Sequence, residues 1–508
     1  MFGGLDVLKM AIIKLLSFVA CVWVVSTTGH EFFSSMDQVM QLVEEKRNLL
    51  EQFNSFINAE EENLQRLRSG LEILRQLSYF KDPENPTTDP VAAYKLIRQL
   101  RILWLTIIIT TEKSPYIDFQ ELLFSDVLKI PSEEDVESGA LALIKLQETY
   151  KLYPVNLTKE TPLNEDEAYY LGLNAYVQDK FQHAFHWFLY TLIIFNETES
   201  FNSIRAFTKE RLLEHLGSSA YHFGSLPVAI YFYQQLLKRD PTNEDVKYML
   251  KLCRNLRFYR TSNPDIFTLN TESTNSYEAL CRGEVKQRTS RRQRTLSCRY
   301  STGGGNPRLI LAPLKEEIEW DEPRIVRYHD IISDKEIEIL KNISRPLLSR
   351  SRVGSGSGTV SNIRLSQGVF LEEDDVVVVH VNQRIADATG LSMETAELLH
   401  VQNYGIGGRY ETHYDAGDQQ NERISTFLIY MSDVEIGGAT VFPKVGVALQ
   451  PKKGSAVFWY NLHKNGDLDL RTMHAGCPVL MGNKWVANKW IHEFGQEFIR
   501  PCSLSEWE

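Results

Sequence analysis

The sequence predicts a multidomain α+β protein. Its N-terminal half is expected to be all helical, with a coiled coil or helical bundle followed by a tetratricopeptide-like repeat, and its C-terminal half to be a double-stranded β-helix, or jelly roll. Three observations predict this: an apolar seven-residue period, a pair of similar helical segments, and short strand-like segments separated by glycines. A chain of 508 residues is also too long for a single core.

Residues 1–29 have the character of a secretory signal peptide. Lys9 precedes an apolar run over residues 10–26, and small residues follow at 26–29, where cleavage is expected. The run is short for a membrane span and contains Lys14, so an uncleaved anchor is the less favoured alternative. After cleavage no membrane span is expected. The net charge of −11 argues against non-specific nucleic-acid binding.

Residues 30–155 are predicted to form a helical domain, because apolar residues recur there every seven positions. The main row is Met36, Val43, Leu50, Ile57, Leu64 and Leu71, and the companion row is Val39, Phe53, Leu67 and Leu74, interrupted by Lys46 and Glu60. Such a seam predicts a coiled coil or helical hairpin that ends at Pro83 and Pro86. The seam is compatible with dimerisation and with a bundle inside one chain. Further helices are expected at residues 90–111 and 132–150.

Residues 156–260 contain an internal repeat. Leu171-Gly172 aligns with Leu216-Gly217, an offset of 45 residues that exceeds the usual tetratricopeptide period. Small residues at matching positions allow two helices to pack closely. The segment is also rich in tyrosine, whose flat ring and hydroxyl suit an extended proline-rich peptide. The candidates are Tyr176, Tyr190, Tyr221, Tyr231 and Tyr233, and the alternative is that such rings form the helix core.

Residues 261–320 are predicted to be a linker, with polar clusters and a basic run at 286–294. The last domain, residues 321–508, should include a helix after the capping box of Ser333 and Glu336. The glycine–serine stretch 354–358 is a candidate lid. Without Cys21 in the signal, five cysteines remain, so one is unpaired. Candidate glycosylation sites for a luminal protein are Asn156, Asn196 and Asn342. The last residues carry no retention tetrapeptide.

Short strands are expected at residues 399–404, 424–431, 439–442, 455–460 and 485–491, because these segments are rich in β-branched and aromatic residues. Such strands favour a sandwich or jelly roll. His413 and Asp415 are two apart and would share one face of a strand, and His474 would come from a distant strand. Two imidazoles and one carboxylate form the set that binds Fe(II) and leaves positions open. The alternative is a solvated pair.

Lys484 lies directly before an apolar strand segment, so its charge is expected to be buried. A buried ammonium needs an anion. That anion is either an acidic side chain of the protein or a dicarboxylate co-substrate that also reaches the metal.

Five stretches carry a resemblance to a known family: residues 401–415, 423–433, 437–443, 451–460 and 474–484. They resemble the catalytic domain of collagen prolyl 4-hydroxylase α subunits, and the resemblance runs through the whole chain. It implies that His413, Asp415 and His474 bind Fe(II) and that Lys484 holds the far carboxylate of 2-oxoglutarate.

The resemblance also implies roles around the metal. Tyr404 and Thr440 match positions that line the co-substrate pocket, whereas Arg423 and Trp490 match positions near the peptide. For these residues, aromatic core and surface charge are the alternative. The family pairs Cys281 with Cys298 and Cys477 with Cys502, and leaves Cys253 free.

The implied reaction hydroxylates carbon four of proline in Xaa-Pro-Gly sequences of collagen-like peptides. O2 is consumed and 2-oxoglutarate is oxidatively decarboxylated to succinate and CO2, with ascorbate as the reductant of oxidised iron. The resemblance favours dimerisation through residues 30–155 and makes residues 156–260 the peptide-substrate-binding domain. It also implies protein disulfide isomerase as the β subunit of an α2β2 tetramer in the endoplasmic reticulum lumen.

Two other functions stay open at this point. One is a 2-oxoglutarate oxygenase that acts on another residue or on another proline-rich secreted protein. The other is a non-catalytic, chaperone-like peptide-binding protein, against which the intact set of metal ligands and Lys484 counts. The sequence departs from the vertebrate pattern at residues 354–358 and in the shortened loop 416–421, and these departures leave the peptide preference open.

Overall fold

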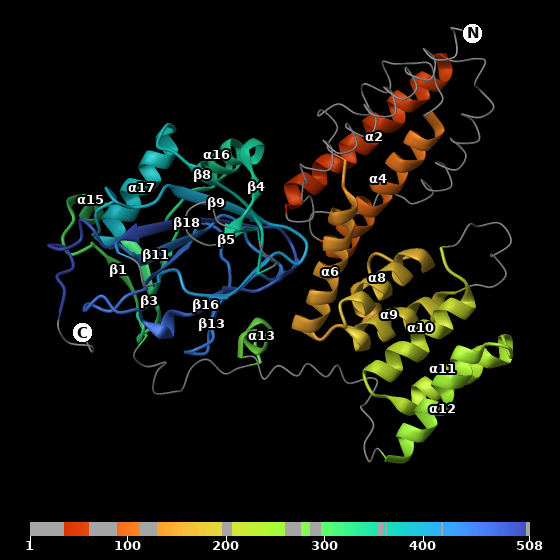
Figure 1. Cartoon of the computed structure of the whole chain (residues 1–508). Coiled ribbons are helices and arrows are strands. Elements are labelled where there is room, and N and C mark those ends of the chain that lie inside the picture. Colours follow the sequence, from red (N-terminus) through yellow and green to blue (C-terminus); the bar gives the residue numbers. More distant parts are fainter. Residues whose placement is uncertain are drawn as a thin grey trace, which may run out of the picture.

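The structure is a computed structural model that describes residues 35–59, 89–111, 130–195, 206–259, 276–284, 296–353, 359–360, 363–417 and 420–503. The early helices occupy one side of the molecule and two β-sheets the other (Figure 1). Several predictions fall outside the described residues: the signal peptide, the later part of the seven-residue period, Asn196, the basic run and the stretch 354–358. Among the helices that are described, none is long and apolar enough to cross a membrane.

The first three described helices are α2 (Met36–Ala59), α4 (Pro90–Thr111) and α6 (Glu133–Tyr150), and the last two match the predicted helices. They pack in sequence around one apolar core. The most buried side chains of α2 include Val39, Leu42 and Leu49, whereas Val43 of the predicted main row is only half-buried. The seam is therefore rotated relative to the prediction, because α2 packs on α4 of the same chain.

Consecutive helix pairs follow in the region of the predicted repeat. They are α7 (Pro154–Leu157), α8 (Glu165–Val177), α9 (Phe181–Ile194), α10 (Lys209–His222), α11 (Leu226–Arg239) and α12 (Glu244–Tyr259). A Cβ on Gly172 would lie 2.5 Å from the ring of Phe188, and one on Gly217 would lie 2.8 Å from the ring of Tyr233. The glycine and the ring are equivalent in the two repeats. The predicted close packing at the small residues is thus confirmed.

The predicted linker contains ordered elements: α13 (Ser276–Cys281), β1 (Cys298–Ser301), α15 (Pro307–Leu311) and β2 (Leu314–Trp320). β1 pairs with β2, and β2 pairs with β3 (Ile325–His329). The large sheet therefore starts before the predicted domain boundary at residue 321. The capping box of Ser333 and Glu336 does begin α16 (Asp334–Ser344), as predicted.

The disulfide pairing is not the one that the resemblance implied. Cys281 is bonded to Cys477. The free cysteines of the described chain are Cys253, Cys298 and Cys502. The physical reason is that α13 packs on β13 and shares an apolar cluster with residues of β13 and β16, which brings Cys281 beside Cys477. Cys298 lies instead in β1, at the outer edge of the large sheet.

Two antiparallel sheets form the jelly roll. The larger has the order β1-β2-β3-β15-β11-β18-β9-β8-β4, and the smaller has the order β14-β13-β16-β10-β7. Their remaining strands are β4 (Ser349–Arg350), β7 (Arg364–Leu365), β8 (Gln367–Leu371), β9 (Leu399–Tyr404), β10 (Arg409–His413), β11 (Arg423–Tyr430), β13 (Thr440–Phe442), β14 (Val447–Leu449), β15 (Ala456–Tyr460), β16 (His474–Gly476) and β18 (Lys484–His492). All five predicted strands are present.

The outer face of the larger sheet is covered by α16 and α17 (Val376–Thr389), whose apolar side chains share a core with the sheet (Figure 1). Short two-stranded pairs complete the jelly roll: β5 (Arg352–Val353) with β6 (Thr359–Val360), and β12 (Ile436–Gly437) with β17 (Val479–Met481). The inner faces of the two large sheets enclose the residues described next.

Candidate active site

The two predicted histidine ligands lie on neighbouring strands of the smaller sheet. His413 ends β10, His474 begins β16, and the antiparallel register places them opposite each other. Asp415 lies two residues beyond the end of β10, so the turn positions it rather than strand alternation. Its carboxylate is 3.7 Å from His413 Nε2 and 3.5 Å from His474 Nε2. One ligand atom from each residue lies within 4.8 Å of the others, which is compatible with a single metal ion.

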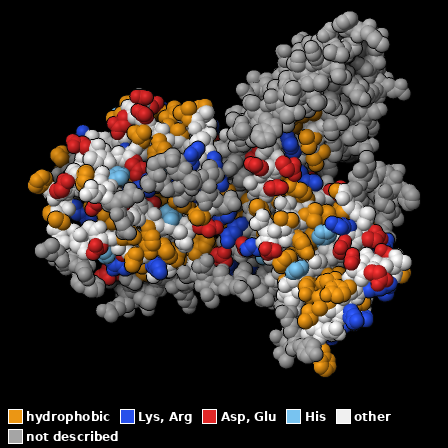
Figure 2. All heavy atoms as spheres, in the orientation of Figure 1, with side chains coloured by type: hydrophobic (Ala, Val, Ile, Leu, Met, Phe, Trp, Pro, Cys, Tyr) orange, Lys and Arg blue, Asp and Glu red, His pale blue; other side chains and the backbone are white. Residues whose placement is uncertain are grey.

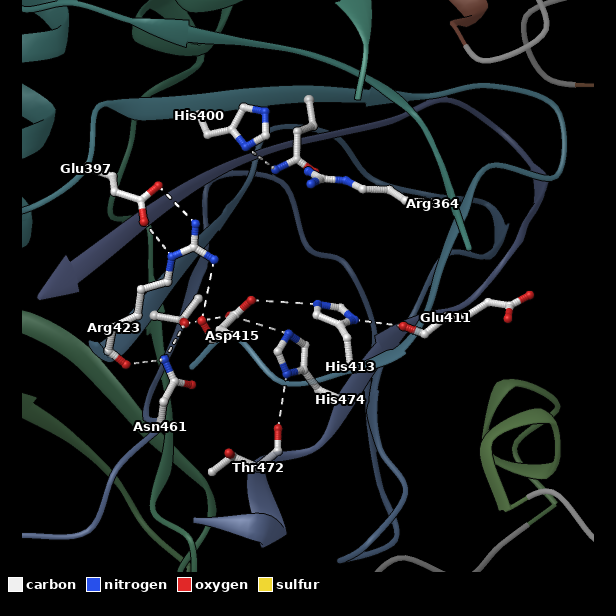
Figure 3. Close-up of polar contacts among 12 residues, drawn as sticks. Arg364, Glu397, His400, Glu411, His413, Asp415, Arg423, Asn461, Thr472 and His474 are labelled. Atoms are coloured by element: carbon white, nitrogen blue, oxygen red, sulfur yellow. Dashed lines mark hydrogen bonds and ion pairs between the residues drawn. The ribbon is translucent and has the colours of Figure 1, made fainter. Parts of the chain in front are cut away.

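Backbone carbonyls orient both imidazoles. His413 Nδ1 donates to the carbonyl of Glu411 at 2.7 Å, and His474 Nδ1 donates to the carbonyl of Thr472 at 3.0 Å (Figure 3). A proton on Nδ1 leaves the Nε2 lone pair free to face Asp415. Hydrogen bonds of this kind fix the tautomer and ring angle of metal-binding histidines.

Asp415 is held by a short hydrogen-bond chain. Its Oδ2 accepts from Thr426 Oγ1 at 2.7 Å, and Thr426 Oγ1 accepts from Asn461 Nδ2 at 3.0 Å. Burial alone would raise the pKa of Asp415, but the adjacent imidazoles and Thr426 hold it at about 2. Burial, and then the neighbouring His474, lower the pKa of His413 to about 3. A carboxylate and a neutral imidazole suit a divalent cation.

Lys484 is buried beside this site, with 3% of its surface exposed. Burial lowers its pKa to about 7, and no carboxylate contributes to that shift. In the described part of the chain its Nζ forms a cation–π contact with Tyr404, and the distance from Nζ to the ring centre is 5.2 Å. The ammonium is thus available for an anion that the protein does not supply.

The two other predicted co-substrate residues lie close to Lys484. Tyr404 is its register partner between β9 and β18. Thr440 is the register partner of Gly476, and a Cβ on Gly476 would lie 3.7 Å from Lys484 Nζ. Thr440 Oγ1 accepts from Tyr430 Oη at 2.8 Å. The fold therefore brings Tyr404, Thr440 and Lys484 to one place, on the inner side of both sheets.

A groove of about 860 Å³ opens over the metal-binding residues, with His413 and Asp415 in its lining. Both predicted peptide contacts also line it. The guanidinium of Arg423 lies 4.0 Å from the ring centre of Trp490, and it forms an ion pair with Glu397. Arg423 is half-buried and stacks in the groove wall, and its role beside a peptide stays a prediction.

Comparison with known proteins now decides the family. Residues 35–162 match the family described as prolyl 4-hydroxylase alpha-subunit, N-terminal region, and residues 399–492 match the 2OG-Fe(II) oxygenase superfamily. The chain is 40% identical over 516 residues to prolyl 4-hydroxylase subunit alpha-2 of Gallus gallus, which covers 94% of this chain and 96% of that protein. The chain belongs to the prolyl 4-hydroxylase α-subunit family. As a member it is an Fe(II)- and 2-oxoglutarate-dependent oxygenase.

A human relative agrees with this prolyl 4-hydroxylase assignment. The human prolyl 4-hydroxylase subunit alpha-1 is 38% identical over 518 residues, covering 94% of this chain and 96% of that protein. Among solved structures, the viral collagen prolyl hydroxylase of Paramecium bursaria Chlorella virus-1, in its 2OG complex, has 25% sequence identity and a TM-score of 0.29, covering 33% of this chain and 95% of that chain.

Sequence reasoning missed several residues of this prolyl 4-hydroxylase groove. Tyr410 stacks on the imidazole of His413, with ring centres 3.4 Å apart, and Arg364 lies 4.8 Å above the ring of Tyr410. Arg364 is buried, and among the described residues its Nε and Nη2 find no hydrogen-bond partner. His400 stacks on Phe370 with ring centres 4.0 Å apart. Tyr410 and His400 flank or lie within matched stretches, whereas Arg364 follows the glycine–serine stretch with no local signal.

The five predicted tyrosines lie on the helix pairs and not in the jelly-roll groove, and they differ in exposure. Tyr231 is 55% exposed. Tyr176, Tyr190 and Tyr221 are half-buried, and the Tyr176 hydroxyl is 2.7 Å from Ser218 Oγ. Tyr233 is only 2% exposed and packs against Gly217, so its ring belongs to the helix core and cannot present a face to a peptide. That part of the prediction is corrected.

Proposed function

We propose that this chain is the catalytic subunit of a collagen-type prolyl 4-hydroxylase. It hydroxylates carbon four of proline in Xaa-Pro-Gly sequences and couples this to oxidative decarboxylation of 2-oxoglutarate to succinate and CO2. One observation carries the proposal: the set of His413, Asp415 and His474 lies beside the buried amine of Lys484, which has no acidic neighbour in the described part of the chain. In a jelly roll without this activity, burying that unpaired charge would only destabilise the folded protein.

Each residue of the set has a role in the proposal. His413, Asp415 and His474 would hold Fe(II), which when bound supplies the activation of O2 and of the keto-acid. Lys484 would bind the distant carboxylate of 2-oxoglutarate, with Tyr404 and Thr440 against its carbon chain. Arg423 and Trp490 would orient the peptide in the groove. Ascorbate would reduce iron that is left oxidised.

The helix pairs are proposed to bind the proline-rich substrate before and during turnover. Half-buried or exposed rings at Tyr176, Tyr190, Tyr221 and Tyr231 would stack on prolines of a polyproline II peptide. Figure 2 shows hydrophobic side chains gathered over the region of α11 and α12, and exposed aromatic side chains there are Tyr231, Tyr248 and Phe258. Such a surface fits an extended apolar peptide better than a charged one.

The proposal extends to partners and location. We infer an endoplasmic reticulum enzyme in which α2 and the residues after it mediate dimerisation, and in which protein disulfide isomerase is the second subunit of an α2β2 tetramer. Three observations are in accord: the predicted signal peptide, a disulfide between Cys281 and Cys477, and exposure of the sequon residues Asn156 and Asn342.

Turnover by the full chain, co-expressed with protein disulfide isomerase, tests the function. The substrates are a repeat peptide with proline before glycine and several non-collagen proline-rich peptides, with succinate and 4-hydroxyproline as readouts. We expect hydroxyproline in the repeat peptide and none with His413→Ala. Hydroxylation confined to the non-collagen peptides would instead establish the second candidate, an oxygenase for other secreted proteins. The sequence difference from the vertebrate pattern at residues 354–358 keeps this candidate open. Full activity of the variant would overturn the ligand assignment.

A further inference from the structure

Helix α6 of the helical half contacts two glycine turns of the jelly roll. Its Ala142 is so close to the turn after β9 that a Cβ on Gly407 would lie 2.9 Å from the Ala142 carbonyl oxygen. At its last residue, the hydroxyl of Tyr150 lies so near Gly437 that a Cβ there would be 2.6 Å from it. Figure 1 shows α6 and α13 between the helix pairs and the sheets. One helix thus touches both turns that border the predicted co-substrate pocket.

The contact at Tyr150 is a buried hydrogen bond. Its Oη donates to the carbonyl of Pro478 at 2.5 Å, and the same carbonyl accepts from the backbone N–H of Gly438 at 3.1 Å. Burial raises the pKa of Tyr150 well above its usual value, so the hydroxyl keeps its proton and stays a donor. One oxygen of the β16–β17 connection therefore ties the helix to the Gly437–Gly438 turn.

The Gly438 end of that turn forms part of the wall around Lys484. A Cβ on Gly438 would lie 3.4 Å from Lys484 Cδ, and Gly438 lies two residues before Thr440, the first residue of β13. The connection that supplies the Pro478 carbonyl also follows Gly476, whose position faces Lys484 Nζ. A shift of the Pro478 carbonyl would therefore move the two surfaces between which the lysine side chain lies.

The C-terminal end of α6 is fixed from a second side by α13. Lys145 Nζ lies 3.1 Å from Glu278 Oε1, and Arg282 Nη1 donates to the carbonyl of Thr149 at 2.7 Å. Cys281 of the same helix is bonded to Cys477, the residue before Pro478. α6 is therefore joined to α13, α13 to the β16–β17 connection through the disulfide, and the connection back to α6 through the Tyr150 hydroxyl.

From this geometry we propose that Tyr150 is a positioning residue for 2-oxoglutarate. It couples docking of the helical half to the shape of the pocket wall at Gly438 and Lys484. The helical half then has two roles: it binds the peptide, and it helps to shape the 2-oxoglutarate site. The inference rests on the proposed function, because it assumes that 2-oxoglutarate is the ligand of Lys484.

Tyr150→Phe removes only the hydroxyl and tests the proposal. We expect the Kd for 2-oxoglutarate, measured by calorimetry without oxygen on the Fe(II)-loaded full chain, to rise about three- to fivefold, in keeping with one lost hydrogen bond. In turnover, KM for 2-oxoglutarate should rise by the same factor, whereas KM for the peptide and kcat stay near wild type. If Tyr150 had a purely structural role, the substitution would lower the yield of active protein and leave the Kd and the KM for 2-oxoglutarate unchanged.

Tyr170→Phe is the matched control, since Tyr170 Oη donates to Glu133 within the helical half at 3.1 Å and forms no hydrogen bond with a described residue of the jelly roll. It should leave the Kd for 2-oxoglutarate unchanged. Equal Kd values for wild type and Tyr150→Phe would overturn the inference. If the wild type itself bound no 2-oxoglutarate, the proposed function would fail instead, so the two failures are distinguishable.

Binding reciprocity gives a readout that needs no turnover. If the Tyr150 contact strengthens 2-oxoglutarate binding, then 2-oxoglutarate must strengthen the contact. We expect the ligand to slow hydrogen exchange in the segment at the end of α6 in the wild type and in Tyr170→Phe, and to have a weaker effect there in Tyr150→Phe. Protection of that segment to the same degree in all three proteins would contradict the coupling.

Discussion

At the scale of single residues, the site is built from groups whose charge is set by burial. Asp415 stays ionised because two imidazoles, Arg423 and a hydroxyl lie beside it. Lys484 is easily neutralised because no acid in the described part of the chain adjoins it. The metal ligands are therefore ready for a cation before it arrives. Above about pH 7 the lysine becomes fully charged only when an anion enters the pocket.

Binding of 2-oxoglutarate should consequently depend on pH. Burial places the pKa of Lys484 at about 7 in the free protein, and a bound carboxylate should raise it. Below that pKa the lysine is already charged and affinity is maximal. Above it binding must take up a proton, so the Kd should rise toward about tenfold per pH unit. Calorimetry between about pH 6.5 and 8.5 in buffers of different ionisation heat would measure this uptake.

In the arginine variant Lys484→Arg the charge is permanent, so its Kd, whatever its size, should not change over that range. A wild-type Kd that is the same at both ends of the pH range would show that Lys484 is charged throughout.

Thr426 should matter for the metal although it is not a ligand. Its hydroxyl donates to Asp415 at 2.7 Å, and Thr426→Val would keep the shape but remove that bond. We expect the affinity for Fe(II), titrated without oxygen, to fall about 10- to 100-fold. Ser425→Ala is the control, because the neighbouring side chain points to the other face of β11 and its hydroxyl has no partner among the described residues. A metal affinity that Thr426→Val leaves unchanged would remove Thr426 from the site.

At the scale of elements, the sequence predicted what local pattern determines. The strands at residues 399–404 and 455–460, the helices at 90–111 and 132–150, and the capping box at Ser333 all follow from composition, spacing and end signals within a few residues. The three predicted metal ligands, which the fold brings together, could be named for the same reason, since they lie in motif-bearing stretches.

What the sequence did not predict depends on partners far along the chain. The seam of α2 is rotated because α4 covers a different stripe, and Tyr233 is core because it packs on Gly217. β1 extends a sheet whose other strands begin later, and α13 selects Cys477 as the disulfide partner. None of these long-range contacts produces a local sequence pattern from which it could have been predicted. Arg364 was missed likewise, since only the folded groove places it above Tyr410.

The helix pairs should be sensitive to a single methyl group at the repeat glycines. Gly172→Ala would press a Cβ against the ring of Phe188, and we expect a loss of about 1–3 kcal/mol in unfolding free energy. Gly139→Ala is the comparison, because its Cβ would meet only Tyr94 at 3.3 Å and alanine favours a helix by about 1 kcal/mol. Hydrogen exchange in urea would measure both effects, in α8 and α9 for Gly172→Ala and in α6 for Gly139→Ala. A Gly172→Ala protein as stable as Gly139→Ala would mean that the ring moves aside.

At the scale of the whole molecule, the disulfide joins the segment after the helix pairs to the strand that carries His474. Digestion without reduction, followed by mass spectrometry, should yield a linked peptide that contains Cys281 and Cys477. Cys298 and Cys502 are exposed and free, so both should react with an alkylating agent in the folded protein, whereas buried Cys253 should react only after unfolding. A link between Cys281 and Cys298 would restore the family pairing and contradict the structure.

The halves of the chain also share a hydrophobic core. Leu365 and Ile406 of the jelly roll are buried in the same cluster as side chains of α2, α4 and α6, and the first backbone N–H of α2 donates to Asn403 at 3.1 Å. A catalytic fragment that began at residue 296 would expose these apolar side chains to water. Such a fragment is expected to aggregate. A shortened enzyme for biotechnology should therefore retain the early helices or carry polar substitutions on that surface.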